Sequence, residues 1–435
     1  MDEKGRVIDI YNGAIAAVDP YRAVMRQKEV ILDAYREGRS TTLRVIGFGK
    51  AAQGMVRAVL DIAGDKVFGG VAITKYGHWA DRGEDRIRVY EAGHPIPDEN
   101  GIRATNQAIV LARSLDEKSL LVCLISGGGS ALLVAPAPGI LLAEKQRTID
   151  LLLRAGADIH ELNAVRKHVS AVKGGRLAQI AYPARVVSLI LSDVIDDRLD
   201  IIASGPTVPD ETTYADALGV IEKYRLRNEV PRKIYDHLVE GKEGSIPEAP
   251  GKDDPLFDGV TNTIVGSNRQ AVEAAGMRCE HLGIDAVKID RPIRGEARDA
   301  GRWLVNEARK MLKKRKDTGR GLCLISGGET TVTVRGRGRG GRNMELALAA
   351  AMEMEGIEGM TLLSAGTDGT DGPTDAAGAI VDGCSIGRGR AAGLDPGECL
   401  SNNDSYCFLR GSGDLFVTGP TGTNVMDIQV ILLSA

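Results

Sequence analysis

Four glycine-bearing turns hold the residue types in this chain that are best suited to chemistry. Each follows a short apolar run typical of a buried strand; the run and turn together occupy residues 45–50 (VIGFGK), 124–130 (LISGGGS), 324–329 (LISGGE) and 363–369 (LSAGTDG). Loops at the carboxyl ends of parallel strands line one crevice, where ligands bind. Gly-rich turns also expose backbone N–H groups that bind anions. These turns predict a two-part α/β enzyme that handles phosphate or carboxylate.

Two charged residues follow expected strands directly. Lys50 lies at an expected strand-to-helix junction, where a lysine can reach a phosphate as a point charge, although an exposed surface lysine is the alternative. Asp193 follows the apolar run 186–192, so its carboxylate is expected to point into the crevice as a base or a metal ligand. The acidic residues after it are alternatively a solvated loop.

An aspartate-rich turn at 366–378 contains Asp368, Asp371 and Asp375. Clustered carboxylates suit Mg²⁺, which binds one or two carboxylates together with substrate phosphates. The alternative is a set of Asx turns, in which each aspartate bonds to its own backbone.

Two basic segments are further candidates. Residues 336–341 match G-x-G-x-x-G. A dinucleotide site also requires an acidic residue at the end of a second strand about 20 residues later. The acidic residues near that position, Glu355 and Glu358, lie instead in an expected helix end and loop. The arginines in and beside this loop suit a phosphate chain, or else form a solvated basic hairpin: Arg335, Arg337, Arg339 and Arg342. The segment 163–177 is expected to begin a helix with Asn163 as its N-cap. Its basic face either binds a carboxylate or is solvated, and it consists of Arg166, Lys167, Lys173 and Arg176. His168 is expected to be packed or on the surface and not catalytic.

Composition excludes several classes of protein. The chain has 435 residues, a net charge of -4 and 4% aromatic residues, which argues against nucleic-acid binding. No apolar run is long enough to span a membrane, and the charged N-terminus lacks a signal core, so we expect a cytoplasmic enzyme. The six cysteines include no C-x-x-C pair, which argues against a structural zinc site or a disulfide framework.

The elements that position these residues follow from hydrophobic periodicity. Expected strands and helices alternate along the chain, which predicts βαβ units. A continuous helix is expected at 163–180, a linker at 241–258, and strands at 263–265 and 331–334. We therefore predict a domain over 1–250 and a second α/β domain over 251–435.

The whole set of motifs resembles glycerate 2-kinases with a C-terminal MOFRL domain. The matching stretches span almost the whole chain: 47–52, 93–98, 126–132, 163–177, 191–194, 203–207, 326–330, 340–345, 364–379 and 419–427. Met344 stands where a polar residue such as Gln is expected, which affects local packing or a minor contact. The resemblance implies a Rossmann-like N-terminal domain with a mostly parallel sheet, a MOFRL-type region over about 320–435, and an active-site cleft between the two domains.

The resemblance also implies the reaction. The expected activity is ATP-dependent phosphorylation of D-glycerate at its 2-hydroxyl, with Mg²⁺ or another divalent cation, to give 2-phosphoglycerate and ADP. Some relatives were labelled hydroxypyruvate reductases, so an NAD(P)H-dependent reductase is the main alternative, and a non-catalytic sugar-acid-binding protein is the third. Neither nucleic acid nor membrane is an expected partner, and the sequence is compatible with a homodimer.

A mechanism assigns roles to the candidate residues. Asp193 would orient the 2-hydroxyl and accept its proton, and Lys50 would stabilise charge on the transferred phosphoryl group. Arg342, from the second domain, would complete the site when the cleft closes. Asp368 and Asp371 would position Mg-ATP, directly or through water. The remaining candidates would bind substrate or phosphate: Ser126, Gly127, Gly128, Gly129, Ser130, Arg166, Lys173, Gly327, Gly328 and Glu329.

Overall fold

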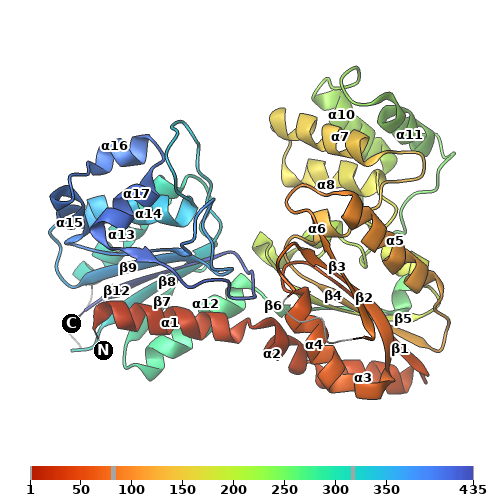
Figure 1. Ribbon diagram of the computed structural model, residues 1–435, viewed down its shortest axis with the longest axis horizontal. Coiled ribbons are helices and arrows are strands. Elements are labelled where there is room, and N and C mark those ends of the chain that lie inside the picture. The colour runs from red at the N-terminus through yellow and green to blue at the C-terminus, as the bar shows by residue number, and fades with distance from the viewer. Residues whose placement is uncertain (1, 80–84, 315–318, 435) are drawn as a thin grey trace. The chain divides into compact units, whose positions relative to one another are not determined.

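The computed structural model describes residues 2–79, 85–314 and 319–434 (Figure 1). The chain folds into two compact units. We call residues 20–265 the parallel-sheet unit, and residues 1–19 together with 266–435 the mixed-sheet unit.

The parallel-sheet unit is built on a six-stranded sheet in the order β3-β2-β1-β4-β5-β6. Its strands are β1 (Thr42–Phe48), β2 (Val67–Lys75), β3 (Ile87–Ala92), β4 (Ser119–Ile125), β5 (Arg185–Leu191) and β6 (Val260–Gly266). The pairs from β3 through β5 are parallel, and β4 is buried along its whole length, as its continuous apolar run predicts. Phe48 pairs in register with Ile125, and Ile125 pairs in turn with Ile190, so β1, β4 and β5 end at the same edge of the sheet.

Helices cover both faces of this sheet (Figure 1). Helices α5 (Glu99–Arg113) and α9 (Arg176–Ala181) share a hydrophobic core with alternate residues of the strands. Helices α3 (Lys28–Glu37) and α4 (Ala52–Ala63) contact other positions of the strands, and α2 (Pro20–Met25) packs on α4. A one-turn helix, α6 (Gly129–Leu132), follows β4.

Four more helices form a group with its own hydrophobic core: α7 (Leu142–Arg154), α8 (Ile159–His168), α10 (Tyr214–Lys223) and α11 (Arg232–Lys242). Helix α8 begins after Asp158, whose carboxylate accepts hydrogen bonds from the N–H groups of His160 and Glu161. The expectation of one helix over 163–180 with Asn163 as its N-cap is therefore wrong. The chain leaves α8 after His168 and turns through Gly174 and Gly175, whose φ values are 57° and 75°, before α9 begins.

The mixed-sheet unit has a six-stranded sheet in the order β11-β10-β9-β12-β8-β7. Its strands are β7 (Asp285–Lys288), β8 (Leu322–Gly328), β9 (Met360–Gly366), β10 (Gly378–Asp382), β11 (Leu415–Phe416) and β12 (Asp427–Leu433). Strand β12 runs antiparallel to both β8 and β9. Since Asp427 pairs in register with Gly328 on one side and Gly366 on the other, β8 and β9 both end beside this residue.

Helices lie on both faces of the mixed sheet (Figure 1). The long helices α1 (Glu3–Ala17) and α12 (Asn268–His281) pack together on one face, and α13 (Ala297–Lys314) and α14 (Arg342–Met354) pack together on the other. The short helices are α15 (Ser385–Ala391), α16 (Pro396–Ser401) and α17 (Ser405–Ser412). Short 3₁₀ helices occur at Gly64–Lys66, Ile195–Asp197, Ile202–Ser204 and Pro255–Gly259.

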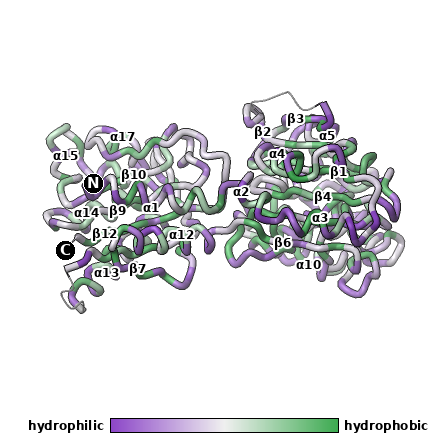
Figure 2. Tube along the Cα trace, turned by 90° about the horizontal axis from the view of Figure 1, so that it is seen from below, coloured by the Kyte–Doolittle hydropathy of each residue, from purple (hydrophilic) through white to green (hydrophobic). Residues whose placement is uncertain are grey.

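Helix α1 is tied to this unit by specific contacts. The Tyr11 hydroxyl donates to Gly366 O at 2.8 Å, and Asp9 accepts a bidentate pair of hydrogen bonds from Arg278. The unit therefore takes its core from both ends of the chain. Figure 2 shows the hydrophobic strands of each unit among more hydrophilic loops. Across the described residues, every helix is too short or too polar to cross a membrane.

Three local expectations need correction. The strand expected at 263–265 in the second domain is β6, at the edge of the parallel sheet. The expected linker 241–258 packs on the parallel-sheet unit, because Pro250 O accepts the Asp210 N–H at 3.1 Å. The strand expected at 331–334 is an isolated bridge at Thr331, since the Thr333 N–H bonds to the Glu296 carboxylate instead of a second strand. The domain ranges 1–250 and 251–435 remain a prediction.

Candidate functional site

The glycine turns after β1 and β4 lie against each other in the parallel-sheet unit. The Lys50 N–H donates to Gly127 O at 2.9 Å, and the Ser126 hydroxyl accepts the Ala51 N–H at 3.1 Å. Gly49 has a φ of 120°, and a Cβ at this position would lie 2.1 Å from Ser126 Oγ. Only glycine fits this close approach, which brings two of the predicted turns together.

Gly128 forms the tip of the turn after β4. Its φ is 82°, and a Cβ here would lie 2.8 Å from the His94 ring and 3.6 Å from Lys50 Cγ. Within the described ranges no acceptor is found for the N–H groups of Gly127 and Gly128. Free N–H groups beside a lysine and a histidine can bind an anionic ligand. Sequence reasoning did not assign His94 a role, although it lies in the matched stretch 93–98.

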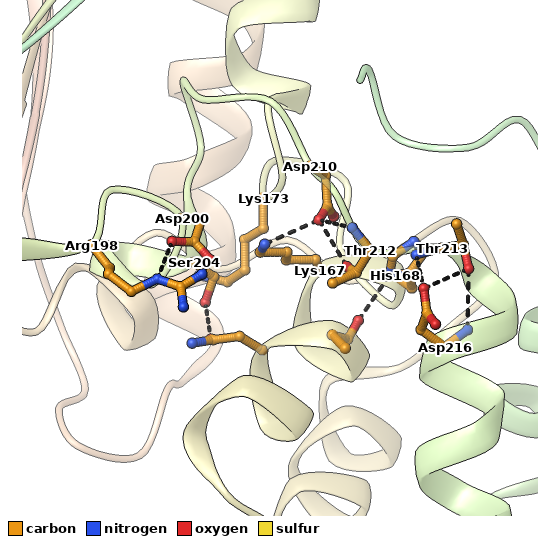
Figure 3. A network of polar contacts seen from close by, with 12 residues as sticks. Lys167, His168, Lys173, Arg198, Asp200, Ser204, Asp210, Thr212, Thr213 and Asp216 are labelled. Atoms are coloured by element: carbon orange, nitrogen blue, oxygen red, sulfur yellow. Dashed lines mark hydrogen bonds and ion pairs between the residues drawn. The ribbon is translucent and has the colours of Figure 1, made fainter. Parts of the chain in front are cut away.

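Asp193 lies where the sequence places it, two residues after the end of β5. The preceding residue, Ser192, accepts a hydrogen bond from the Val194 N–H at 3.3 Å, which forms a tight turn around Asp193. Of the later acidic residues, Asp200 pairs with Arg198 through two hydrogen bonds of 3.0 and 2.8 Å (Figure 3). The chain thus holds Asp193 at the same sheet edge as Lys50 and the Ser126–Ser130 turn.

Lys173 is buried beside the turn after β4, with 1% of its surface exposed. Its Nζ donates to Ser130 O at 3.0 Å, to Ser130 Oγ at 3.2 Å and to Ala203 O at 3.2 Å. Burial, with smaller contributions from Lys145 and Arg166, holds the pKa of Lys173 well below its usual value. The alternative that this lysine lies on a solvated basic face is therefore wrong.

The hydrogen bonds extend from Lys173 into α8. The Ser130 and Ser204 hydroxyls lie 3.2 Å apart, and the Ser204 hydroxyl donates to Asn163 Oδ1 at 2.8 Å. Lys173 and Ser204 belong to the network of polar contacts drawn in Figure 3. Ser204 itself has a left-handed φ of 62°, a strained conformation that clusters at binding sites. Sequence reasoning missed Ser204 and gave Asn163 only a capping role.

Two other residues of the basic segment have structural partners. The Lys167 Nζ pairs with Asp210 at 3.0 Å, and both side chains are buried (Figure 3). The His168 ring bonds to Ala164 O at 2.8 Å and to Glu248 at 3.2 Å, so this histidine is packed. Arg166 is half-buried, and its pKa is lowered by burial.

The mixed-sheet unit brings together Arg342, Asp427 and Glu329. The Arg342 guanidinium bonds to Asp427 at 2.6 and 2.9 Å and to Glu329 at 2.9 Å. Burial lowers the pKa of Arg342, but Asp427 and Glu329 outweigh it and raise the pKa above its usual value. Asp427 was missed as a site residue; its place immediately before the apolar run 428–433 was the available signal.

The two aspartates expected to hold Mg²⁺ differ in their surroundings. Asp371 is 2% exposed, and its carboxylate accepts the N–H groups of Asn343 and Met344 at 3.1 and 2.8 Å, at the start of α14. Burial, partly offset by these hydrogen bonds, raises its pKa to about 7. Asp368 accepts the Thr370 N–H and hydroxyl at 3.1 and 3.0 Å, which is an Asx turn. In the described part of the chain no three His, Cys, Asp or Glu side chains form a metal cluster. One carboxylate together with substrate phosphates is enough to bind Mg²⁺. Asp368 fits this role better than Asp371, because the Asp371 carboxylate already accepts two backbone N–H groups.

The glycines of the loop 336–341 fit against the protein itself. A Cβ on Gly336 would lie 2.2 Å from Asn402 O, and one on Gly338 would lie 2.4 Å from the Asp404 side chain. The loop N–H groups donate to side chains of the segment 402–404, among them Arg335 N–H to Asn403 at 2.7 Å. The G-x-G-x-x-G pattern here therefore serves packing against α16 and α17.

Gly327 and Gly328 are the last residues of β8, not a free turn. A Cβ on Gly327 would lie 1.9 Å from Asn268 Oδ1, and one on Gly328 would lie 2.3 Å from Ile293 O. Gly327 O accepts the Ile293 N–H at 2.8 Å. Glu329 is the residue of this segment whose side chain reaches Arg342.

Comparison with known proteins places this chain in one family. A model described as a domain of unknown function (DUF4147) matches residues 6–239, and the MOFRL family model matches residues 322–427. The D-glycerate 2-kinase of Thermotoga maritima is 44% identical over 99% of this chain and 98% of its own length. A relative in Agrobacterium vitis, provisionally named a hydroxypyruvate reductase, is 42% identical over 89% of this chain and 98% of its own length.

A solved structure agrees with the sequence comparison. The crystal structure of glycerate kinase from Thermotoga maritima matches with a TM-score of 0.87 and 43% identity, over 99% of both chains. The chain belongs to the DUF4147–MOFRL family, that of the glycerate kinases to which it is similar along nearly its whole length.

Proposed function

We propose that this protein is a D-glycerate 2-kinase that transfers the γ-phosphoryl group of ATP to the 2-hydroxyl of D-glycerate. The products are 2-phosphoglycerate and ADP. The observation that carries the proposal is the 44% identity to a D-glycerate 2-kinase over 99% of the chain. The anion-binding character of the parallel-sheet unit supports it, because both substrates are anions.

The parallel-sheet unit supplies the groups proposed to act on glycerate. Positioning and electrostatic stabilisation provide most of the catalysis in phosphoryl transfer. The turn 126–130, Arg166 and Lys173 bind the carboxylate, which the cationic surroundings of Lys173 support. Asp193 orients the 2-hydroxyl and accepts its proton, and Lys50 stabilises charge on the transferred group.

The mixed-sheet unit supplies the groups proposed to act on phosphate. Arg342 offers a planar guanidinium suited to phosphoryl oxygens. Asp427 and Glu329 hold that guanidinium in one orientation, which supports its role. Gly327 and Gly328 contribute by letting Asn268 and Ile293 pack at the end of β8, so that Glu329 can reach Arg342.

Mg²⁺ is the proposed metal of the reaction. When bound with ATP it neutralises charge on the phosphate oxygens. Asp368 would hold it, and Asp371 would contribute through water. Chelation with EDTA should abolish phosphoryl transfer and Mg²⁺ should restore it, whereas full activity in EDTA would remove the metal from the proposal.

The two alternatives have less support. A hydroxypyruvate reductase requires a dinucleotide site, but the glycines of the loop 336–341 pack against Asn402 and Asp404. A non-catalytic sugar-acid-binding protein has no use for Lys50 and Asp193 at one sheet edge. A cytoplasmic location, where ATP is supplied, and a homodimer remain parts of the proposal.

One experiment tests the function directly. The purified protein is incubated with D-glycerate, ATP and Mg²⁺, and the product is identified by ³¹P NMR. A signal from 2-phosphoglycerate supports the proposal, and 3-phosphoglycerate keeps a kinase but overturns the position of transfer. Absence of a phosphorylated product, together with NADH oxidation in the presence of hydroxypyruvate, would establish the reductase instead.

A further inference from the structure

A cluster of cations lies inside the parallel-sheet unit where α7, α8 and the segment before α9 meet. We call Lys145, Arg166 and Lys173 the cation cluster. Lys145, on α7, is 6% exposed, and its Nζ donates to Val169 O at 3.3 Å. Arg166 lies in the last turn of α8 and Lys173 in the short segment between α8 and α9, so elements that meet here carry all three cations; the charges of Lys145 and Arg166 contribute to the lowered pKa of Lys173.

Three acidic groups of the surrounding segments are engaged with other partners. On α7 itself, Glu144 accepts the Leu141 N–H at 2.8 Å. Beside α8, Asp210 pairs with Lys167 at 3.0 Å. The remaining carboxylate, Glu248, bonds to the Tyr214 N–H at 3.0 Å and to His168.

Other cationic groups from the surrounding helices do not neutralise the cluster. On α9, Arg176 donates to Lys167 O at 3.2 Å and to the Tyr214 hydroxyl at 3.5 Å. On α11, His237 bonds to His168 O at 3.0 Å, and burial lowers its pKa. These groups add positive charge or none.

Arg166 of the cation cluster and Asn163, one turn earlier on α8, have donors that lack acceptors. The Arg166 guanidinium makes no hydrogen bond or ion pair within residues 2–79, 85–314 and 319–434. The Asn163 Nδ2 atom is buried without a partner, while its Oδ1 accepts from Ser204. Buried donors without acceptors are costly, so an arrangement of this kind points to a bound anion.

We propose that the cation cluster and Asn163 Nδ2 bind the carboxylate of glycerate, and that Lys145 takes up one proton from water as the carboxylate binds. The proposal rests on the proposed kinase function and adds Lys145 and Asn163 to its substrate site. The neutral amine of Lys145 becomes an ammonium, and the new positive charge pairs with the bound carboxylate. No other bond is made or broken.

The hydrogen bonds favour Lys145 over Lys173 as the proton acceptor. Burial, followed by Arg166 and Arg176, lowers the pKa of Lys145 to about 7, and burial also holds the pKa of Lys173 well below its usual value. Lys173 Nζ already has three oxygen acceptors, whereas Lys145 Nζ has a single backbone acceptor and keeps N–H groups for a bound carboxylate. Free Lys145 is therefore mostly neutral above its pKa, and a bound carboxylate raises that pKa.

Isothermal titration calorimetry of the full chain with D-glycerate tests the proposal. Binding heats are measured at two pH values, in pairs of buffers with different ionisation enthalpies. We expect uptake approaching about one proton per glycerate at about pH 8 and almost none at about pH 6, where Lys145 is already charged. Binding without proton uptake at the higher pH would overturn the proposal.

Variants assign the proton to one residue. Lys145→Met should remove the uptake and weaken binding at the lower pH by about tenfold. Lys145→Arg keeps the charge, so it should bind glycerate without proton uptake. Arg147→Met changes an exposed cation on the same helix and should leave both quantities unchanged. Uptake that persists in Lys145→Met would exclude Lys145 as the acceptor.

Two further measurements show which anion the cation cluster binds and whether the proposed kinase function holds. Titration with ATP in place of glycerate should show no uptake that depends on Lys145, and uptake with ATP alone would assign the cluster to phosphate and overturn the carboxylate site. The ³¹P assay is run in parallel on the unchanged protein. Formation of 2-phosphoglycerate without proton uptake refutes this inference alone, whereas a failed assay refutes the function. If the variants do not fold, the uptake of the unchanged protein at the two pH values still decides the matter.

Discussion

Asp193 and Asp371 both follow a strand and a turn, yet their surroundings give them different capacities. Asp193 lies half-buried at the edge of the parallel sheet. The Asp371 carboxylate is occupied by two N–H groups at the start of α14. Asp371 therefore suits the role of a helix cap, and we propose Asp193, at the same sheet edge as Lys50, as the base.

Replacement of Asp193 tests its role as the base. Asp193→Asn keeps the size of the side chain but removes its basicity, so kcat should fall by roughly 10²–10⁴-fold. KM for ATP should change little. Steady-state kinetics with D-glycerate and ATP measure both constants. Asp200→Asn, at the Arg198 pair, is the control, and near-normal turnover of the Asp193 variant would remove it from the mechanism.

Replacement of Lys50 separates charge stabilisation from simple binding. Lys50→Ala should lower kcat by roughly 10²–10³-fold, because a charge directed at the transferred group acts in the transition state. Lys50→Arg should recover part of the loss. If kcat were normal and only KM rose, Lys50 would be a ground-state binder of ATP or glycerate.

The residue types at the site were visible in the sequence, but their partners were not. The positions of Lys50 and Asp193 after apolar strands predicted their placement at a common sheet edge. Lys145 gave no signal, because its burial depends on how α7 packs against α8. The pair between Arg342 and Asp427 joins residues 85 positions apart, which only the register of β12 brings together.

At the scale of elements, the arginine-bearing loop is held by the segment that joins α16 and α17. Asn403 accepts the Arg335 and Gly336 N–H groups at 2.7 and 3.0 Å, and its Nδ2 donates to Glu345 at 3.0 Å. Glu345 also pairs with Arg298 on α13. One buried asparagine thus connects the loop to two helices.

Loss of the Asn403 side chain should loosen this loop. Asn403→Gly permits the left-handed φ of 54° at this position, so the effect of the lost hydrogen bonds is isolated. We expect the free energy of unfolding to fall by about 2 kcal/mol. Urea unfolding measures it. Asn402→Ala, which removes a single hydrogen bond to the Arg337 N–H, should cost less, and equal losses in the two variants would contradict the anchoring role.

The Asp371 cap gives a second prediction at this scale. Asp371→Ala leaves the Asn343 and Met344 N–H groups without their acceptor, so α14 should fray and the melting temperature should fall in the absence of Mg²⁺. Asp371→Asn retains one acceptor oxygen and should lose less. Thermal unfolding with and without Mg²⁺ checks this, and a loss seen only with Mg²⁺ would favour a metal role instead.

Most expected strands and helices agree with the structure to within one to three residues, but topology was harder to infer. Strand β12 lies at Asp427–Leu433, where a mostly apolar run favours a strand. The antiparallel pairing of β12 with its neighbours could not be deduced from its sequence, because its apolar run 430–433 is equally typical of a buried parallel strand. The helix expected over 163–180 is wrong because α8 begins earlier, after Asp158, and ends at His168, and the left-handed residues Gly174 and Gly175 precede α9.

At the scale of the whole molecule, the two units differ in how they use the chain. The parallel-sheet unit is one continuous segment, residues 20–265. The mixed-sheet unit needs α1 from the beginning of the chain and β12 from its end. Tyr11 is central to this arrangement, since its ring lies edge-on to Phe416 at 5.3 Å and its hydroxyl bonds to Gly366.

A change at Tyr11 should therefore be felt far away in sequence. Tyr11→Ala should destabilise the mixed-sheet unit by about 3–5 kcal/mol, as for a buried aromatic side chain. Hydrogen exchange should accelerate in β9 and β12 and stay unchanged in β1 and β4. Tyr21→Ala, in the parallel-sheet unit, is the control. Uniform acceleration in all four strands would mean that the units unfold together.

The use of both chain ends has a consequence for synthesis on the ribosome. Residues 20–265 emerge as a complete unit and can fold while the rest of the chain is still being made. Helix α1 is translated before the parallel-sheet unit, but its partners in β9 and β12 are translated after that unit. Its apolar face, with Val7, Ile10 and Tyr11, cannot be covered fully until β9 and β12 have been translated. A nascent chain stalled before residue 427 should therefore expose this helix to chaperones, although it already carries a folded parallel-sheet unit.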